Sequence, residues 1–314
     1  MQELLRIAIL DDYQEAALTM ADWSPLRGKA EITVFSDHVA QEDQLVQRLK
    51  EYDVLCLMRE RTPISFETLC HLPRLKLIVS TGAKNAALDT KAAAALNIAV
   101  RHTRYPESGA PELTWALLMA LARHIPDEAR NMRQNRWQST IGTDLKGKTL
   151  GIIGLGRVGS QVAQYAKAFG MEVIAWSENL TAEKAAAAYA RTVSKNELFE
   201  QADFVTLHLV LSERSRHTVT ETELALMKPG ACFINTSRGA LVDEQALISV
   251  LQQKKIAGAA LDVYGTEPLP AAHPFRTLGN VLATPHIGYV TEDTYRVFYT
   301  DTVKAIGDWL NSGH

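Results

Sequence analysis

The stretch TLGIIGLGRVGSQVAQYAKAFG, from Thr149 to Gly170, decides the fold of this chain. It opens with the apolar run Leu150–Ile153, passes through a glycine-rich turn and continues in a helical pattern. Gly154 permits a sharp turn, Gly156 lets the backbone approach a pyrophosphate, and Gly159 lets the helix pack close to the strand. The start of such a helix also offers free N–H groups to an anion. Strand, turn and helix in this order favour dinucleotide binding over an ordinary turn, with the cofactor at Gly154, Gly156, Arg157, Val158 and Gly159.

The composition is that of a soluble globular protein. The 314 residues suffice for two domains, and 46% are hydrophobic and 22% charged. The net charge is -3 and the chain has no basic block, so we do not expect it to bind nucleic acid. Cys56, Cys70 and Cys232 lie far apart, which predicts neither a metal site nor a disulfide framework. With no signal peptide and no apolar run long enough to span a bilayer, we expect a cytoplasmic protein without a membrane partner.

The first hundred residues alternate between strand and helix patterns. A typical helical pattern is Glu42–Leu49. The predicted strands are Leu5–Leu10, Glu31–Phe35, Asp53–Met58, Leu75–Val79 and Ile98–Val100. This alternation predicts a parallel sheet with helices on both faces.

The same rhythm returns in the second half. Arg101–Pro111 contains proline and glycine and is predicted to be a linker, and Glu112–His124 is an apolar helix, expected to be buried or at a subunit interface. An irregular segment, Gln134–Lys148, precedes the glycine turn. Six strands are expected, the count of a complete dinucleotide-binding sheet: Leu150–Ile153, Glu172–Trp176, Asp203–His208, Ala231–Asn235, Ala257–Val263 and Val281–Ala283. The predicted helices are Ala182–Arg191, Glu221–Met227, Asp243–Gln253 and Thr291–Leu310. The fold class is therefore α/β, with two doubly wound parallel-sheet domains.

Three chemically useful side chains follow three predicted strands of the second sheet, where ligands of parallel sheets bind. Arg238 follows one strand, Glu267 the next and His286 the last. Arginine grips a carboxylate with two donors, histidine is the usual general acid–base, and a neighbouring carboxylate would fix its orientation. Each alone is more often a surface residue. Together, after a dinucleotide turn, they indicate a small anionic substrate and a proton transfer. His208, beside Leu209–Leu211, is expected to form a wall of the site.

Several motifs then occur in a recognisable order. They are LKGKTLGIIGLGRVG (Leu145–Gly159), MKPGACFINTSRGALVDEQAL (Met227–Leu247), IAGAALDVYGTEPLP (Ile256–Pro270), NVLATPHIG (Asn280–Gly288) and IVSTGAKNAALD (Ile78–Asp89). The chain resembles the NAD(P)-dependent D-isomer-specific 2-hydroxyacid dehydrogenase family, which includes phosphoglycerate dehydrogenases and glyoxylate/hydroxypyruvate reductases. The resemblance implies a Rossmann NAD(P)-binding domain at residues 101–289 and a flavodoxin-like substrate domain at 1–100 with 290–314. It also implies an oxidoreductase that transfers a hydride between a nicotinamide and a D-2-hydroxy acid/2-keto acid pair, working as a homodimer.

The resemblance implies roles for individual residues. Arg238 would bind the substrate carboxylate, His286 would exchange the hydroxyl proton, and Glu267 would pair with His286. The remaining cofactor contacts would be Ser177, His208, Thr236, Arg238, Asp262, His286 and Gly288. Asp262 would orient the nicotinamide, although a strand-end cap is an open alternative. Backbone N–H groups of Thr81, Gly82 and Ala83 would hold the substrate carboxylate. Arg59 is expected either at a charged substrate or in solvent, and Glu112 and Thr114 fall where the family's helix meets the cofactor.

The chain departs from the family pattern in a few places. Ser177 stands where an acidic residue usually binds the adenosine ribose, and Glu178 follows it. Since Glu178 would repel a 2′-phosphate, NAD is favoured and NADP stays open. Val210 replaces a common proline, and Asn97 a common glycine. The side chain of the 2-keto acid is not identified.

Other functions are compatible with the same fold. An NAD(H)-sensing, corepressor-like protein is the main alternative, and the lack of low-complexity extensions argues against it. A formate dehydrogenase relative would lack Glu267. An L-malate-type enzyme would not carry arginine, glutamate and histidine in this order. The expectation is therefore a dehydrogenase that acts on a small 2-hydroxy acid.

Overall fold

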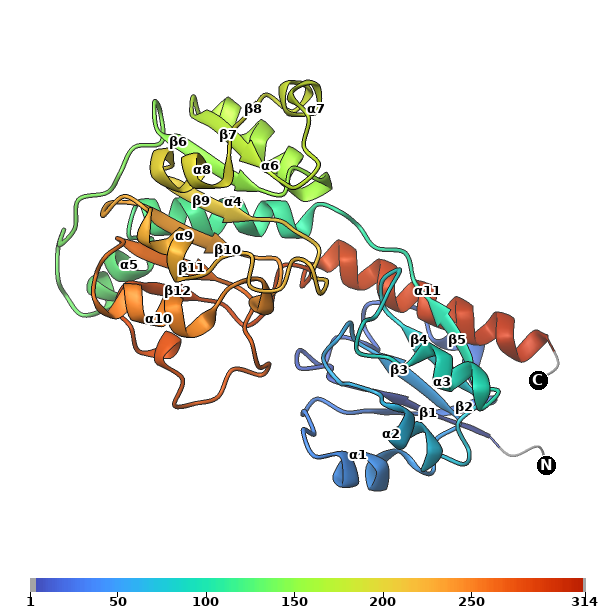
Figure 1. The fold of residues 1–314 in the computed structure, drawn as a ribbon. Coiled ribbons are helices and arrows are strands. Elements are labelled where there is room, and N and C mark those ends of the chain that lie inside the picture. The colour runs from blue at the N-terminus through green and yellow to red at the C-terminus, as the bar shows by residue number, and fades with distance from the viewer. Residues whose placement is uncertain (1–3, 313–314) are drawn as a thin grey trace. The chain divides into compact units, whose positions relative to one another are not determined.

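The computed structural model describes residues 4–312, which form two compact units. The first unit combines the chain up to Pro106 with the segment from Val290 onward, and the second unit is Glu107–Tyr289. Each is built on a parallel β-sheet flanked by helices (Figure 1). The predicted α/β class with two doubly wound sheets is therefore confirmed. Within residues 4–312, no helix is both long and apolar enough to cross a bilayer.

The first unit has five strands in the order β2-β1-β3-β4-β5, the flavodoxin-like order. They are β1 Leu5–Ile9, β2 Ala30–Val34, β3 Val54–Leu57, β4 Leu77–Ser80 and β5 Ala99–His102. Helices α1 (Glu42–Leu49), α2 (Phe66–Cys70) and α3 (Thr90–Ala95) pack on one face, and the long α11 (Glu292–Asn311) runs along the sheet (Figure 1). Strands β3 and β4 are buried throughout, which explains their continuous apolar sequences.

The predicted linker Arg101–Pro111 is wrong at both ends. Strand β5 continues to His102, and the following Arg104 is fixed to α11. Its backbone N–H and guanidinium donate to the Asp301 carboxylate at 2.9, 3.0 and 2.8 Å, and this contact lowers the pKa of Asp301. Helix α4 (Gly109–Ala122) already includes Pro111, because the first helical turn needs no N–H partner there. The chain is irregular only over residues 103–108.

The second unit has seven strands in the order β12-β11-β10-β9-β6-β7-β8. They are β6 Thr149–Ile153, β7 Glu172–Trp176, β8 Arg191–Thr192, β9 Phe204–Leu207, β10 Cys232–Asn235, β11 Gly258–Leu261 and β12 Val281–Ala283. All six predicted strands are present, and β8 is an additional edge strand. The helix predicted over Ala182–Arg191 is α7 (Ala182–Ala187) only, because Arg191 pairs with Ile174 in the sheet.

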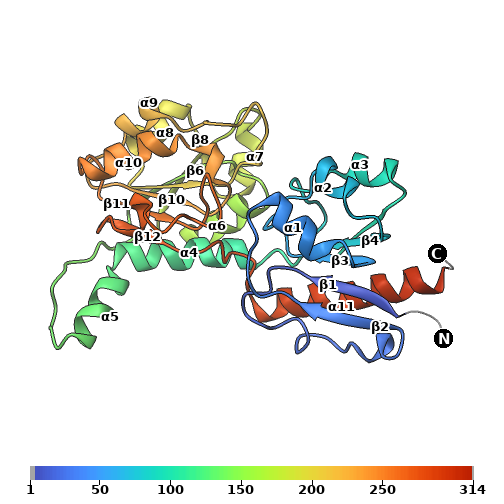
Figure 2. The same ribbon diagram turned by 90° about the horizontal axis from the view of Figure 1, so that it is seen from below.

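Helices cover both faces of this second sheet. Helices α4 and α6 (Arg157–Ala168) share one core with the strands. Helices α8 (Lys195–Gln201), α9 (Glu221–Ala225) and α10 (Glu244–Gln252) form the other. Helices α5 (Ile125–Arg133) and α8 were not predicted, although Ser194 and Glu197 form a capping box at the start of α8. Helix α5 and the loop after it extend away from the sheet (Figure 2).

Candidate active site

The glycine turn lies where the strand order of the second sheet reverses, between β6 and β9. Gly154 has φ +95°, and a Cβ there would lie 2.8 Å from the carbonyl carbon of His208. A Cβ on Gly159 would lie 2.2 Å from the Gly154 oxygen. Around Gly156, by contrast, a Cβ would meet nothing within 4 Å. Gly154 and Gly159 are thus required for packing, whereas Gly156 leaves open space at the start of α6. N–H groups of a first helical turn have no partner within the helix, so those of Arg157, Val158 and Gly159 would fit a pyrophosphate there.

Two further predicted cofactor residues border this turn from neighbouring strands. Ser177 directly follows β7, and the next residue, Glu178, is exposed. His208 follows β9, and its Nε2 lies 2.9 Å from the Thr206 hydroxyl. Burial lowers the pKa of His208 to about 3, so the ring is neutral near pH 7. A neutral ring suits a wall of the site better than a proton donor.

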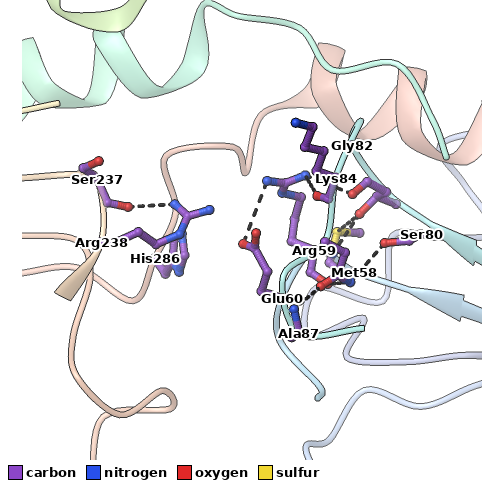
Figure 3. A network of polar contacts seen from close by, with 12 residues as sticks. Met58, Arg59, Glu60, Ser80, Gly82, Lys84, Ala87, Ser237, Arg238 and His286 are labelled. Atoms are coloured by element: carbon purple, nitrogen blue, oxygen red, sulfur yellow. Dashed lines mark hydrogen bonds and ion pairs between the residues drawn. The ribbon is translucent and has the colours of Figure 1, made fainter. Parts of the chain in front are cut away.

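Arg238 lies in a tight loop at the end of β10. The Asn235 side chain, 2% exposed, donates to the Arg238 carbonyl at 3.0 Å and accepts from the Ser237 N–H at 3.0 Å. The Ser237 hydroxyl donates to the Leu209 carbonyl at 2.7 Å. The Arg238 guanidinium donates to the Ser237 carbonyl at 2.7 Å (Figure 3). The loop is therefore fixed from both sides, and Asn235, which holds it, was not singled out in the sequence.

Glu267 and His286 come together at the ends of β11 and β12. The Glu267 Oε2 lies 2.5 Å from Nδ1 of His286, and its Oε1 accepts the Tyr264 N–H at 2.9 Å. The His286 ring also packs against Tyr289, with ring centroids 5.4 Å apart. Because Nδ1 is taken by the carboxylate, Nε2 is the ring nitrogen left to exchange a proton with a ligand. The expected contact between these two residues is present.

Asp262 holds the loop that carries His286. It is fully buried and accepts the Thr284 hydroxyl at 2.6 Å and the Ile287 and Gly288 N–H groups at 2.8 and 2.9 Å. Burial raises its pKa. These contacts fit the strand-end cap that the sequence left as an alternative. His286 itself has φ +52°, an uncommon conformation for a non-glycine residue, and the cap helps to hold it.

The two residues predicted on α4 differ in position. Thr114 is fully buried, and its hydroxyl lies 2.6 Å from that of Thr236 at the end of β10. Thr114 therefore holds the Thr236 side chain in place and is not exposed to a ligand. Glu112 is exposed.

The residues predicted to bind the substrate in the first unit lie in a loop whose backbone is hydrogen-bonded within that unit. The Thr81 N–H donates to the Leu57 carbonyl at 3.0 Å, and the Gly82 N–H to the Thr103 hydroxyl at 2.8 Å. Two of the three amides expected to hold a carboxylate are thus bonded within the unit, and only Ala83 is exposed. Gly82 has φ +81°, a conformation that other residues rarely adopt, and a Cβ there would lie 1.7 Å from the Arg59 guanidinium and would displace it.

Arg59 is part of this loop rather than a solvated residue. Its side chain is 15% exposed, donates to the Thr81 carbonyl at 3.0 Å and lies 5.0 Å above the Tyr105 ring. Asn85 donates to the Arg59 carbonyl at 2.7 Å and fixes its backbone, which has φ +54°. These contacts hold the guanidinium at the carboxyl end of β3 and β4, where the Glu60 carboxylate lies 3.9 Å from it.

The chain is similar to known proteins, first of all over its second unit. A family model described as the NAD binding domain of D-isomer specific 2-hydroxyacid dehydrogenases matches residues 115–288. The D-3-phosphoglycerate dehydrogenase of Methanocaldococcus jannaschii is 36% identical over 307 residues, 96% of this chain and 57% of that protein. The hydroxypyruvate reductase of Thermotoga maritima is 35% identical over 289 residues, 90% of this chain and 92% of that protein. The chain thus spans little more than half the length of the first relative.

A solved structure agrees over the whole chain. The phosphoglycerate oxidoreductase from Vibrio cholerae superposes with a TM-score of 0.94 at 37% identity, covering 99% of this chain and 100% of that one. The reversed strand order and the glycine turn define a dinucleotide-binding α/β protein with a paired glutamate and histidine. The chain belongs to the D-isomer-specific 2-hydroxyacid dehydrogenase family, and its cofactor is a nicotinamide dinucleotide, NAD or NADP.

Proposed function

We propose that this protein transfers a hydride between a nicotinamide dinucleotide and a D-2-hydroxy acid/2-keto acid pair. The observation that carries the proposal is the Glu267–His286 contact of 2.5 Å at the edge of the sheet where Arg238 also lies. Membership of the family supports it, since the named relatives are dehydrogenases and reductases of such acids. Residues 101–289 would bind the cofactor, and residues 1–100 with 290–314 would bind the substrate.

The mechanism assigns one task to each residue. The bound nicotinamide supplies or accepts the hydride. Arg238 binds the substrate carboxylate through its two-donor fork. In the direction of reduction, His286 gives the Nε2 proton to the carbonyl oxygen, and in oxidation it takes the hydroxyl proton. Glu267 holds the ring in the orientation that this transfer needs. Asp262 fixes the His286 loop. Arg59 and the exposed Ala83 of the Thr81–Ala83 loop are assigned to substrate binding, since the Thr81 and Gly82 N–H groups are bonded within the unit.

We infer a preference for NAD over NADP. The support is local: Ser177 follows β7, and the exposed Glu178 carboxylate comes next. A carboxylate at this place repels a 2′-phosphate. Replacing Glu178 with glutamine would then improve the use of NADPH more than that of NADH.

The function is tested by following the oxidation of NADH and NADPH at the nicotinamide absorbance band. The substrates are glyoxylate, hydroxypyruvate, pyruvate, 2-ketoglutarate and phosphohydroxypyruvate. We expect turnover with at least one of them, faster with NADH. Tight NADH binding without turnover of any 2-keto acid would contradict the proposed reaction.

We also propose that the protein is a cytoplasmic homodimer that associates through α4, α5 and the loop that follows α5. The support is an exposed apolar surface on the projecting segment: Ile125 is 51%, Met132 56%, Trp137 72% and Ile141 95% exposed. Such a patch marks a protein interface more often than a solvated surface. The free thiols Cys56, Cys70 and Cys232 fit a reducing compartment.

Glu128 offers a direct test of this dimer surface. One carboxylate oxygen accepts the Ser139 N–H at 3.0 Å and the Ser139 and Thr140 hydroxyls at 2.9 and 2.6 Å, so it ties the loop to α5. These bonds lower the pKa of Glu128 to about 2. A lowered pKa means that the stabilising contribution is complete above the usual carboxyl pKa and is lost as the pH falls toward about 2.

We therefore expect the wild-type dimer to be equally stable at pH 5 and pH 8, and Glu128→Gln to dissociate several-fold more readily at both. Sedimentation velocity over a protein dilution series measures this. Asp127→Asn, one residue earlier in the same helical turn, is the control. A Glu128→Gln dimer as tight as the wild type would contradict the role assigned to this loop.

A further inference from the structure

We propose that Glu244, together with His273, is a positioning pair that fixes the backbone on which Glu267 depends; the inference rests on the proposed function. Neither residue belongs to the predicted site. Glu244 is the first residue of α10, directly after the N-cap Asp243. His273 lies in the segment between β11 and β12 that also carries Glu267.

Glu244 binds this segment at two points. Its Oε2 accepts the Gly265 N–H at 3.0 Å, and its Oε1 lies 3.2 Å from Nε2 of His273. The other ring nitrogen of His273 accepts the Phe275 N–H at 3.3 Å. That contact places the proton of the neutral ring on Nε2, where it points at Glu244. One carboxylate therefore holds both ends of the stretch from residue 265 to residue 273.

The first of these anchors lies next to the catalytic pair. The N–H groups of two successive residues bind two different carboxylates: Tyr264 binds Glu267 at 2.9 Å, and Gly265 binds Glu244 at 3.0 Å. Glycine restricts the backbone little by itself. The Tyr264–Gly265 peptide is therefore oriented by its close packing against Gly239 and by the bond of its N–H to Glu244. Without Glu244, the Gly265 N–H loses its acceptor, and the turn that presents the Tyr264 N–H to Glu267 loses one of its anchors, while the Tyr264 hydroxyl keeps its bonds to the Leu261 and Thr284 carbonyls.

The Glu267 carboxylate is anchored by the Tyr264 N–H on Oε1 and by the His286 ring on Oε2. Loss of the first leaves the carboxylate free to rotate against the ring. Small misplacements of a catalytic group reduce turnover strongly. The glycine turn that accommodates the cofactor lies after β6, on a different strand, so cofactor affinity is not expected to change.

The test compares Glu244→Ala, Glu244→Gln and the control Glu221→Ala, which removes an exposed acid from the first turn of α9 in the same unit. We expect Glu244→Ala to lower kcat by about 10- to 100-fold with an unchanged dissociation constant for NADH. Glu244→Gln keeps one acceptor oxygen and should recover part of the loss. In a Glu267→Gln background, Glu244→Ala should cost less than about twofold, because the two residues act through one contact.

A second readout does not need turnover. The His286 proton shared with Glu267 should give a downfield imidazole N–H resonance, assigned by its absence in His286→Asn. We expect that resonance to weaken or shift in Glu244→Ala and to persist in Glu221→Ala. If Glu244→Ala fails to fold, Glu244→Gln and His273→Gln carry the same comparison.

An unchanged resonance, or full additivity with Glu267→Gln, would overturn the inference. Absence of turnover by the unsubstituted protein would instead contradict the proposed function. In that case the resonance alone still decides the role of Glu244.

Discussion

Replacing Arg238 with alanine is expected to lower kcat/KM for the 2-keto acid by about 100- to 1000-fold. That loss corresponds to about 3–4 kcal/mol, which lies within the range of about 2–5 kcal/mol for truncating one partner of a hydrogen-bonded charge pair. The loop is fixed by Asn235 and Ser237, so the guanidinium is presented with little freedom. Arg238→Lys keeps the charge but loses the two-donor fork, and it should fall between alanine and the wild type.

Steady-state kinetics at saturating NADH measure this effect, and fluorescence titration measures NADH binding separately. Arg214→Ala, an exposed arginine in the loop after β9, is the matched control and should leave kcat/KM unchanged. If Arg238→Ala retained kcat/KM within twofold of the wild type, another residue would have to bind the substrate carboxylate.

Much of the fold could be predicted from the sequence because buried parallel strands are continuous apolar runs. Strands β9 and β10, for example, are buried along their whole length and lie inside the predicted ranges. Strand β8 could not be predicted in this way, since it is two residues long and half-exposed. The place of Arg104 could not be predicted in this way either, because its contact with Asp301 joins residues far apart in the sequence.

The candidate site was predictable only at its chemically reactive positions. A rule about strand ends located Arg238, Glu267 and His286 because each follows a strand of one parallel sheet. The residues that hold them follow no such rule. The Tyr264 hydroxyl lies 3.0 Å from the Leu261 carbonyl and 2.8 Å from that of Thr284, so it joins the ends of β11 and β12. A tyrosine in this place looks like any other apolar residue in the sequence.

A left-handed backbone conformation explains one departure of the sequence from the family pattern. Asn97, where the family commonly has glycine, has φ +57°, which accounts for that preference. Asparagine tolerates this conformation better than most residues do. The departure from the family pattern is therefore a conservative one, and it concerns the backbone rather than the chemistry.

The same conformational argument selects the best substitution for the proposed acid–base residue. His286 has φ +52°, so asparagine can replace it without a new backbone conformation, whereas other residues would add strain. His286→Asn is expected to lower kcat by about 10²- to 10⁴-fold, the usual contribution of a general acid–base. NADH affinity should stay the same. His217→Asn is the control, since His217 is exposed and has φ +50° in the same unit.

Combining this change with Glu267→Gln tests whether the two residues act as one. Glu267→Gln alone should lower kcat less than His286→Asn does, because the ring stays in place without its charged partner. The double variant should be no slower than His286→Asn, since Glu267 has nothing left to orient. Kinetics of the four proteins at one pH, with NADH binding measured for each, complete the cycle. Multiplicative losses in the double variant would mean that Glu267 acts on the reaction independently of His286, and the pairing assigned to them would be wrong.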